Sequence, residues 1–310
     1  MSTMLNAHGQ PRRHRRCQLS VPASNTKMIQ KASESGVDHV FLDLEDACAP
    51  NQKVSARDNI VDALNNLDWG DTVRCVRIND TGTQWCHDDV ITVVEKAGEN
   101  LDCIMLTKPY DASDVQFVDK LLTQLELKLG LNKKIGLELL IEETLGLQNV
   151  EEIAASTPRL EAMIFGMGDY SASQGLEFDA IYGPDYKYPG DVFHYAKFRV
   201  AMAARARGID AIDGPFANIR NTDAYRDSCN QARALGMVGK WALHPTQIPH
   251  AQEIFTPDEA KVAKARKMTE AYRESEARGE GAVMIDGEFA DAATVRLYAN
   301  TLDLADLYGI

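Results

Sequence analysis

The sequence lacks several features that would place it in other classes of protein. No stretch approaches the roughly 18 to 20 uninterrupted apolar residues that a membrane-spanning helix requires. The six cysteines are scattered and form no CxxC pair, which indicates free thiols in a reducing compartment. The sequence has 33 basic residues against 46 acidic ones, which gives a net charge of −13. We therefore expect neither nucleic acid nor an anionic membrane as a partner. The polar N-terminus has no apolar segment of the secretory type, and we expect a cytoplasmic protein that acts on small molecules.

The chain alternates between short, β-rich apolar runs and longer stretches with helical spacing. Eight runs are predicted to be strands: residues 17–21, 39–44, 72–78, 103–107, 134–141, 160–165, 209–212 and 239–243. Helices are expected at residues 25–35, 54–65, 88–97, 112–129, 147–155, 191–207, 223–235 and 257–278. Eight strand-and-helix units in about 250 residues predict an α/β fold of the (β/α)8 TIM barrel type, with a doubly wound open sheet as the second choice. No linker divides the chain, so we expect one barrel over residues 1–278 and a C-terminal helical extension over residues 279–310.

Ionisable residues follow most of the predicted strands. They are Asp43, Glu45, Asp46, Arg77, Lys108, Glu142, Glu143, Asp169, Asp213 and His244. Because the carboxyl ends of barrel strands converge on one mouth, these side chains become neighbours, and crowded carboxylates would repel each other without a cation between them. Carboxylate oxygens without cysteine or paired histidine favour Mg²⁺ or Mn²⁺. Such an ion would leave positions for a chelating 2-oxo acid and would act as a Lewis acid.

Two strand ends have more than one interpretation. The glycines of Gly166-Met167-Gly168-Asp169 let the backbone approach a ligand, so the N–H groups near Gly168 and Asp169 are candidates for binding a carboxylate. A tight structural turn explains these glycines about as well. Lys108 would suit a Schiff-base aldolase, but pairing with a carboxylate of the mouth is the favoured reading.

Several segments resemble one known family. They are SVPASNTKMIQKA, FLDLEDACAP, VRIN, LLIEETLGLQNVEEIA, MIFGMGDYSASQG, DGPF and GKWALHPTQI, in this order along nearly the whole chain. These segments are similar to those of the citrate lyase β-subunit superfamily, also called the HpcH/HpaI aldolase superfamily. Within it they most resemble the lyases of L-malyl-CoA and β-methylmalyl-CoA.

The resemblance implies a metal site and a cation for the substrate. In the family's IExxxG motif the glutamate four places before the glycine binds the metal, which here selects Glu142, counted back from Gly146, rather than Glu143. The aspartate of the GxGD turn, Asp169, is the second ligand. Arg77 of the RxN strand would point its guanidinium at the thioester oxygen.

The resemblance also implies that residues outside this set take part. Glu45 and Asp46 would orient Arg77 and the metal-bound water. The family's C-terminal segment acts as a lid that crosses to a neighbouring subunit and delivers an aspartate. Asp291 is the match, with Asp286 as the alternative because Phe289 stands where methionine is usual. Such a lid requires at least a dimer, and the family suggests a homohexamer built as a trimer of dimers.

The activity implied is the Mg²⁺-dependent, reversible cleavage of L-malyl-CoA to acetyl-CoA and glyoxylate, and of β-methylmalyl-CoA to propionyl-CoA and glyoxylate. The alternatives are a malyl-CoA thioesterase, a citramalyl-CoA lyase and a non-catalytic subunit of an acyl-carrier complex. CoA is polyanionic, and we expect Arg16, Lys27 and Lys31 to bind it near the mouth, with His244 lining the acyl-CoA channel or serving as a structural residue.

Overall fold

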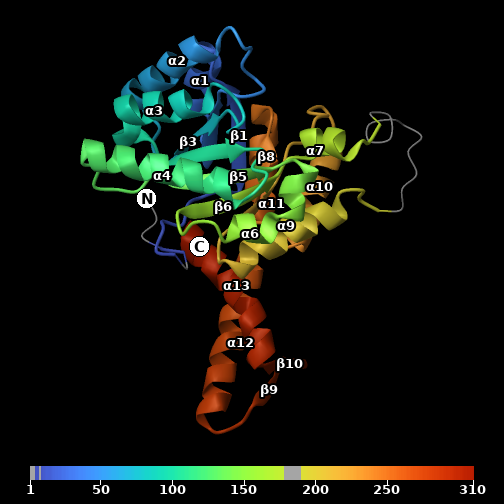
Figure 1. Ribbon diagram of the computed structural model, residues 1–310. Helices are drawn as coiled ribbons and strands as arrows, with labels where there is room; N and C mark the ends of the chain where they lie inside the picture. The colour runs from blue at the N-terminus through green and yellow to red at the C-terminus, as the bar shows by residue number, and fades with distance from the viewer. Residues whose placement is uncertain (1–3, 7, 178–189) are drawn as a thin grey trace.

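The computed structural model describes residues 4–6, 8–177 and 190–310. Its centre is a closed barrel of eight parallel strands, in which each strand pairs with the next and β8 pairs with β1 (Figure 1). The strands are β1 (Cys17–Pro22), β2 (His39–Asp43), β3 (Val73–Ile78), β4 (Cys103–Thr107), β5 (Gly136–Ile141), β6 (Leu160–Phe165), β7 (Asp210–Asp213) and β8 (Gly239–Ala242). The predicted (β/α)8 barrel is confirmed, and the open sheet kept as second choice is wrong because the ends of the sheet meet.

Helices surround the barrel and follow its strands. They are α1 (Thr26–Ser33), α2 (Lys53–Asn66), α3 (Cys86–Ala97), α4 (Ala112–Leu129), α5 (Thr144–Gln148), α6 (Val150–Ala154), α7 (Met167–Gln174), α9 (His194–Ala206), α10 (Thr222–Ala234) and α11 (Ile248–Phe255), with short 3₁₀ turns η1 (Gly98–Asn100) and η2 (Pro245–Gln247). The single helix predicted at residues 147–155 is wrong. Asn149, at φ −98° and ψ 14°, divides this stretch into α5 and α6.

Local sequence sets the boundaries of the regular helices. Helix α4 begins after Asp111, whose carboxylate accepts a hydrogen bond from the N–H of Ser113, while Asp114 closes the capping box. It ends at Gly130, whose φ of +64° suits glycine because it has no Cβ. The helix predicted at residues 112–129 therefore has the same bounds as α4.

Two apolar layers hold the barrel together. The larger one lies between strands and helices, and the smaller one fills part of the barrel interior with Phe41, Met105, Ile164 and Trp241. Every residue of β2, β4, β5 and β6 is buried. Strands buried on both faces read as continuous apolar runs, which is why the sequence revealed them.

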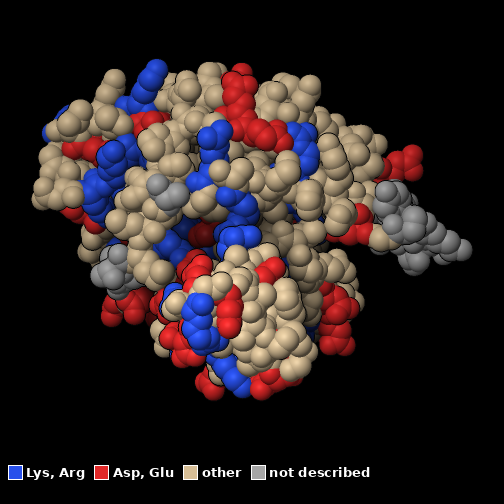
Figure 2. Space-filling view, turned by 90° about the horizontal axis from the view of Figure 1, so that it is seen from below, with Lys and Arg blue, Asp and Glu red and all other residues tan. Residues whose placement is uncertain are grey.

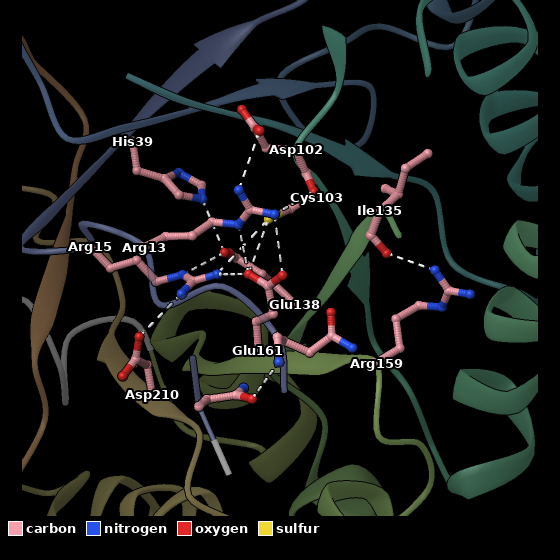
Figure 3. Close-up of polar contacts among 12 residues, drawn as sticks. Arg13, Arg15, His39, Asp102, Cys103, Ile135, Glu138, Arg159, Glu161 and Asp210 are labelled. Atoms are coloured by element: carbon pink, nitrogen blue, oxygen red, sulfur yellow. Dashed lines mark hydrogen bonds and ion pairs between the residues drawn. The ribbon is translucent and has the colours of Figure 1, made fainter. Parts of the chain in front are cut away.

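The end of the barrel at which the strands begin is filled by charged side chains (Figure 3). Arg15, just before β1, is fully buried and its guanidinium contacts Glu138 at 2.8 Å, Glu161 at 2.5 Å and Asp210 at 3.1 Å. Glu138 also contacts Nε2 of His39 at 3.1 Å. Each buried charge therefore has partners of opposite sign, as burial requires.

An arm projects from this end of the barrel (Figure 1). It consists of α12 (Glu259–Ala277), the hairpin of β9 (Ala282–Ile285) and β10 (Glu288–Asp291), and α13 (Ala292–Tyr308). The predicted helical extension is confirmed, with a hairpin in addition. Helix α12, which we expected within the barrel unit of residues 1–278, packs against α13 and the hairpin instead.

The end of α13 lies against the segment before β1. Tyr308 stacks under the guanidinium of Arg16, 4.5 Å from ring centroid to Cζ, and its ring lies 5.2 Å from that of His14. Seen from below, Lys and Arg side chains gather around a hollow beside the arm (Figure 2). None of the helices in the described part of the chain is long and apolar enough to cross a membrane.

Candidate active site

Four carboxylates surround one ammonium group at the end of the barrel where the strands finish. Lys108 follows β4, and its Nζ donates a hydrogen bond to Glu45. The same Nζ lies 3.1 Å from Oδ2 of Asp169, 3.7 Å from Oε1 of Glu142 and 3.7 Å from Oδ2 of Asp46. These acidic residues follow β2, β5 and β6, so the barrel brings together residues that lie up to 124 positions apart (Glu45 to Asp169). We call this group the mouth cluster.

The charges of the mouth cluster change how its members hold protons. Burial and the neighbouring carboxylate of Glu45 raise the pKa of Asp46 to about 6. Burial would lower the pKa of Lys108, but the carboxylates of Glu142 and Glu45 raise it above its ordinary range. Lys108 is therefore a cation at neutral pH.

Arg77 is fixed beside this cluster. Its Nε donates to Oδ1 of Asp43 at 2.8 Å, and its Nη2 donates to the other oxygen of the same carboxylate. Its Nη1 lies 3.3 Å from Oε2 of Glu45. Burial would lower the pKa of Arg77, but Asp43 raises it, so the guanidinium is a permanent positive charge with one orientation.

Asp43 was expected at the mouth, but we assigned it no role there from the sequence. It is the register partner of Arg77 across β2 and β3. Its carboxylate also accepts the N–H groups of Glu45 at 2.8 Å and Ala47 at 3.1 Å, and so shapes the loop that carries Glu45 and Asp46. The signal was present in the sequence, since an acid and a base end two consecutive strands that pair with each other.

Glu142 has properties expected of a ligand for a divalent cation. Glu142 is 4% exposed, its Oε1 has no hydrogen-bond partner, and burial raises its pKa well above the ordinary range. Such a buried oxygen is costly unless a cation approaches it. A Cβ at Gly166 would lie 2.6 Å from Oε2 of Glu142, so this glycine leaves room for the carboxylate. With Asp169 as the second expected ligand, the donors would be hard carboxylate oxygens, which suit Mg²⁺ or Mn²⁺.

Gly168 and Asp169 lie in the first turn of α7. No atom approaches within 4 Å of the position of a Cβ at Gly168, so the space beside it is open. The first N–H groups of a helix have no partner within that helix and favour negative charge. This geometry is compatible with the expected carboxylate contact.

Asp291 does not reach the mouth of its own chain. It ends β10 and caps α13 on the arm, where its carboxylate accepts the N–H of Thr294 at 2.8 Å and the hydroxyl of the same residue at 3.0 Å. These bonds lower the pKa of Asp291. The alternative, Asp286, has a φ of +50° and pairs with Lys267 at 2.5 Å. A role in catalysis for either acid therefore requires a second subunit.

The predicted CoA-binding residues lie in different places. Our placement of Arg16 near the mouth is wrong: it precedes β1 at the opposite end of the barrel, and its guanidinium donates to Asp38 at 2.7 Å and 2.6 Å. Lys27 and Lys31 are exposed on α1, which follows β1. His244 is exposed after β8, and its Nδ1 lies 2.9 Å from the hydroxyl of Thr246 and caps η2.

One further group could hold a metal in the part of the chain that the structure describes. It comprises His39, Cys75 and Glu138, all buried in the barrel interior. It is separate from the mouth cluster. Arg15 and the amide of Gln18 already occupy the oxygens of Glu138, so a cation there would meet a positive charge.

A closed (β/α)8 barrel with acids and fixed cations at the carboxyl ends of its strands defines a barrel enzyme, since the reactive groups of this architecture lie at that end. More specifically, the chain belongs to the HpcH/HpaI aldolase/citrate lyase family, whose model matches residues 16–245. The family comprises carbon–carbon lyases of the aldolase and citrate lyase type.

Individual relatives are similar over nearly their full length. An L-malyl-CoA/β-methylmalyl-CoA lyase of Cereibacter sphaeroides is 41% identical over 92% of this chain and 93% of its own. A (3S)-malyl-CoA thioesterase of the same species is 31% identical over 93% of each. The crystal structure of CitE from Mycobacterium tuberculosis in complex with magnesium, acetoacetate and coenzyme A covers 94% of this chain and 97% of its own, with a TM-score of 0.73 and 27% identity.

Proposed function

We propose that this protein is a Mg²⁺-dependent lyase that reversibly cleaves L-malyl-CoA to acetyl-CoA and glyoxylate, and β-methylmalyl-CoA to propionyl-CoA and glyoxylate. The observation that carries the proposal is the position of Glu45, which contacts both Arg77 and Lys108. Through these contacts a fixed guanidinium and the carboxylates of Glu142 and Asp169 share one mouth. The relative that is 41% identical and carries this activity in its name supports the choice of substrates.

Each residue of the mouth has a part in this reaction. Glu142 and Asp169 would hold the metal, and Mg²⁺ or Mn²⁺ bound there would supply a Lewis acid for the oxygens of the 2-oxo acid. In cleavage the hydroxyl group of the substrate loses its proton to water in the mouth, and the bond between the α and β carbons breaks. This leaves an enolate on the thioester fragment, and Arg77 supplies positive charge where the thioester oxygen becomes negative. Because Asp43 and Glu45 hold Arg77 in place, little reorganisation is needed as the charge develops.

Further residues bind the substrate and move a proton. Glu45 and Asp46 orient Arg77 and water in the mouth, and the N–H groups near Gly168 and Asp169 bind the carboxylate of glyoxylate. Asp291 of a neighbouring subunit returns a proton to the α-carbon of acetyl-CoA after cleavage and removes it in condensation. Delivery into a closed mouth would raise its pKa from the lowered value that Thr294 causes in the single chain.

CoA binding and assembly complete the proposal. Lys27, Lys31 and His244 lie on segments that follow β1 and β8, and they offer contacts for the phosphates and the pantetheine chain. The arm that carries Asp291 acts as a lid between subunits of a homohexamer, a trimer of dimers. The buried, unpaired cysteines support a cytoplasmic location.

The products of the reaction test this proposal. Purified protein incubated with L-malyl-CoA and Mg²⁺ should release glyoxylate and acetyl-CoA, measured by trapping glyoxylate with phenylhydrazine. Malate with free CoA thiol would instead identify a thioesterase, the candidate that the 31% identical relative favours. With citramalyl-CoA, release of pyruvate and acetyl-CoA at a higher kcat/KM would identify a citramalyl-CoA lyase, and no turnover of any thioester would contradict the lyase.

A further inference from the structure

Lys108 has an unfavourable backbone conformation. Its φ is +51°, in the left-handed region that residues other than glycine rarely adopt. The next residue is Pro109, and a residue before proline is restricted further, toward extended conformations. Strain of this kind persists only when the surroundings over-determine the conformation, and it is concentrated at functional sites. The lysine side chain therefore has interactions that offset the strain.

Those interactions are the contacts of its ammonium group. Nζ of Lys108 lies within 4 Å of all four carboxylates of the mouth cluster, and its side chain is only 16% exposed. In the part of the chain that the structure describes, no other Lys or Arg forms an ion pair with Glu142 or Asp169. Lys108 thus lies against both carboxylates that we assign to the metal.

Lys108 cannot neutralise four carboxylates, and Arg77, which contacts Glu45, is already paired with Asp43. The cluster stays negative and attracts a second, divalent cation. That cation and the ammonium group would then repel each other within the same few ångströms, and this repulsion is strong in a partly buried site. Lys108 can retreat without losing every partner, because its hydrogen bond to Glu45 does not involve Glu142 or Asp169.

We propose that Lys108 is the resident cation of the mouth, which holds the four carboxylates together before a divalent ion binds and competes with that ion for Glu142 and Asp169. This inference rests on the proposed function, because it takes those two carboxylates as the metal ligands. Lys108 accordingly sets the affinity for the metal and acts as a positioning residue. It needs no Schiff base for this role.

Metal affinity and the stability of the metal-free protein test the proposal. Lys108→Met removes the ammonium group and keeps the length of the side chain. We expect Mn²⁺ to bind the full-length Lys108→Met variant at least about tenfold more tightly than it binds the wild type, because a like charge is lost. Titration followed by electron paramagnetic resonance measures both affinities. The metal-free variant should unfold at a lower temperature than the metal-free wild type, and saturating Mn²⁺ should narrow that difference.

Two further variants make the test specific. Lys134→Met removes an exposed positive charge that precedes β5, far from the mouth, and should change neither quantity. Lys108→Gln keeps a donor for Glu45 and should fold even if Lys108→Met does not, again with tighter Mn²⁺ binding. Equal or weaker binding of Mn²⁺ by the Lys108 variants would overturn this inference alone. A wild type that binds no Mn²⁺ would overturn the metal site as well.

Discussion

Arg77 and Asp43 face each other across β3 and β2 and form a two-point ion pair, in which Nε and Nη2 of the arginine donate to both oxygens of the carboxylate. The remaining nitrogen, Nη1, lies 3.3 Å from Glu45. A planar fork held at two points has one orientation, and a lysine cannot reproduce that geometry. The direction of the positive charge is therefore set by the sheet, before any substrate binds.

Arg77→Lys should keep the charge but lose its direction. We expect kcat/KM for cleavage of L-malyl-CoA to fall about 10²- to 10³-fold, the range found when one donor to a developing oxyanion is removed. Trapping the released glyoxylate with phenylhydrazine measures this kcat/KM. Arg207→Lys, at an exposed arginine that follows α9, serves as the control. A variant with unchanged kcat would mean that Arg77 does not meet the developing charge.

Glu142→Gln should remove a metal ligand while keeping the shape of the side chain. Mutating a residue that only supports a metal ligand typically weakens metal affinity about 10- to 100-fold. Because Glu142 is assigned as a ligand itself, we expect its Mn²⁺ affinity to fall at least about 100-fold, with a parallel loss of activity. Mn²⁺ titration checks it. Glu143→Gln changes the adjacent glutamate, which directly precedes α5, and should bind Mn²⁺ like the wild type. If Glu143→Gln lost Mn²⁺ binding and Glu142→Gln kept it, the metal ligand of the IExxxG motif would be Glu143.

The strands and their order could be predicted because buried parallel strands are continuous apolar runs. Residues 103–107 and 160–165 were predicted with the bounds that the structure has. No helix was predicted at α7, because the glycines at positions 166 and 168 weaken any helical pattern. The hairpin of β9 and β10 was missed because only Ala290 of its eight residues is buried, so alternation is weak.

The mouth could be predicted in outline because every residue that follows a strand lies at the same end of the barrel. The same rule places Arg16, which precedes β1, at the other end, and our expectation for Arg16 failed because it was judged by distance along the chain alone. The number of carboxylates that Lys108 contacts could not be predicted. It depends on side-chain directions after β2, β4, β5 and β6, which sequence spacing does not give.

The charged side chains at the end of the barrel where the strands begin predict that the stability of the protein depends on pH. Burial would raise the pKa of Glu138, but His39 and Arg15 lower it below its ordinary value of about 4.5. A depressed folded pKa means that Glu138 contributes stability above about pH 4.5, and that this contribution is lost as the pH falls toward the folded pKa.

Glu138→Gln should therefore destabilise the protein at neutral pH and matter less in acid. We expect a loss of about 3 kcal/mol at pH 7, at the low end for a broken buried pair because Arg15 keeps Glu161 and Asp210. Urea unfolding of both proteins at pH 7 and at pH 4 measures the difference. Glu253→Gln, which breaks an exposed pair with Arg226, is the control and should change little. A deficit that grew toward pH 4 would contradict the assigned partners.

Mixed subunits can decide whether the arm completes a neighbour's mouth. Asp291 lies on the arm and Glu142 in the barrel, so a site built from two chains takes one residue from each. Asp291→Asn and Glu142→Gln should each be inactive, while subunits unfolded together and refolded as mixed oligomers should regain activity, because some mouths then combine an intact barrel with an intact arm. Asp286→Asn, in the turn between β9 and β10 of the same hairpin, should stay active alone if Asp291 is the acid. Mixed oligomers without recovered activity would mean that the arm does not supply the proton across the subunit boundary.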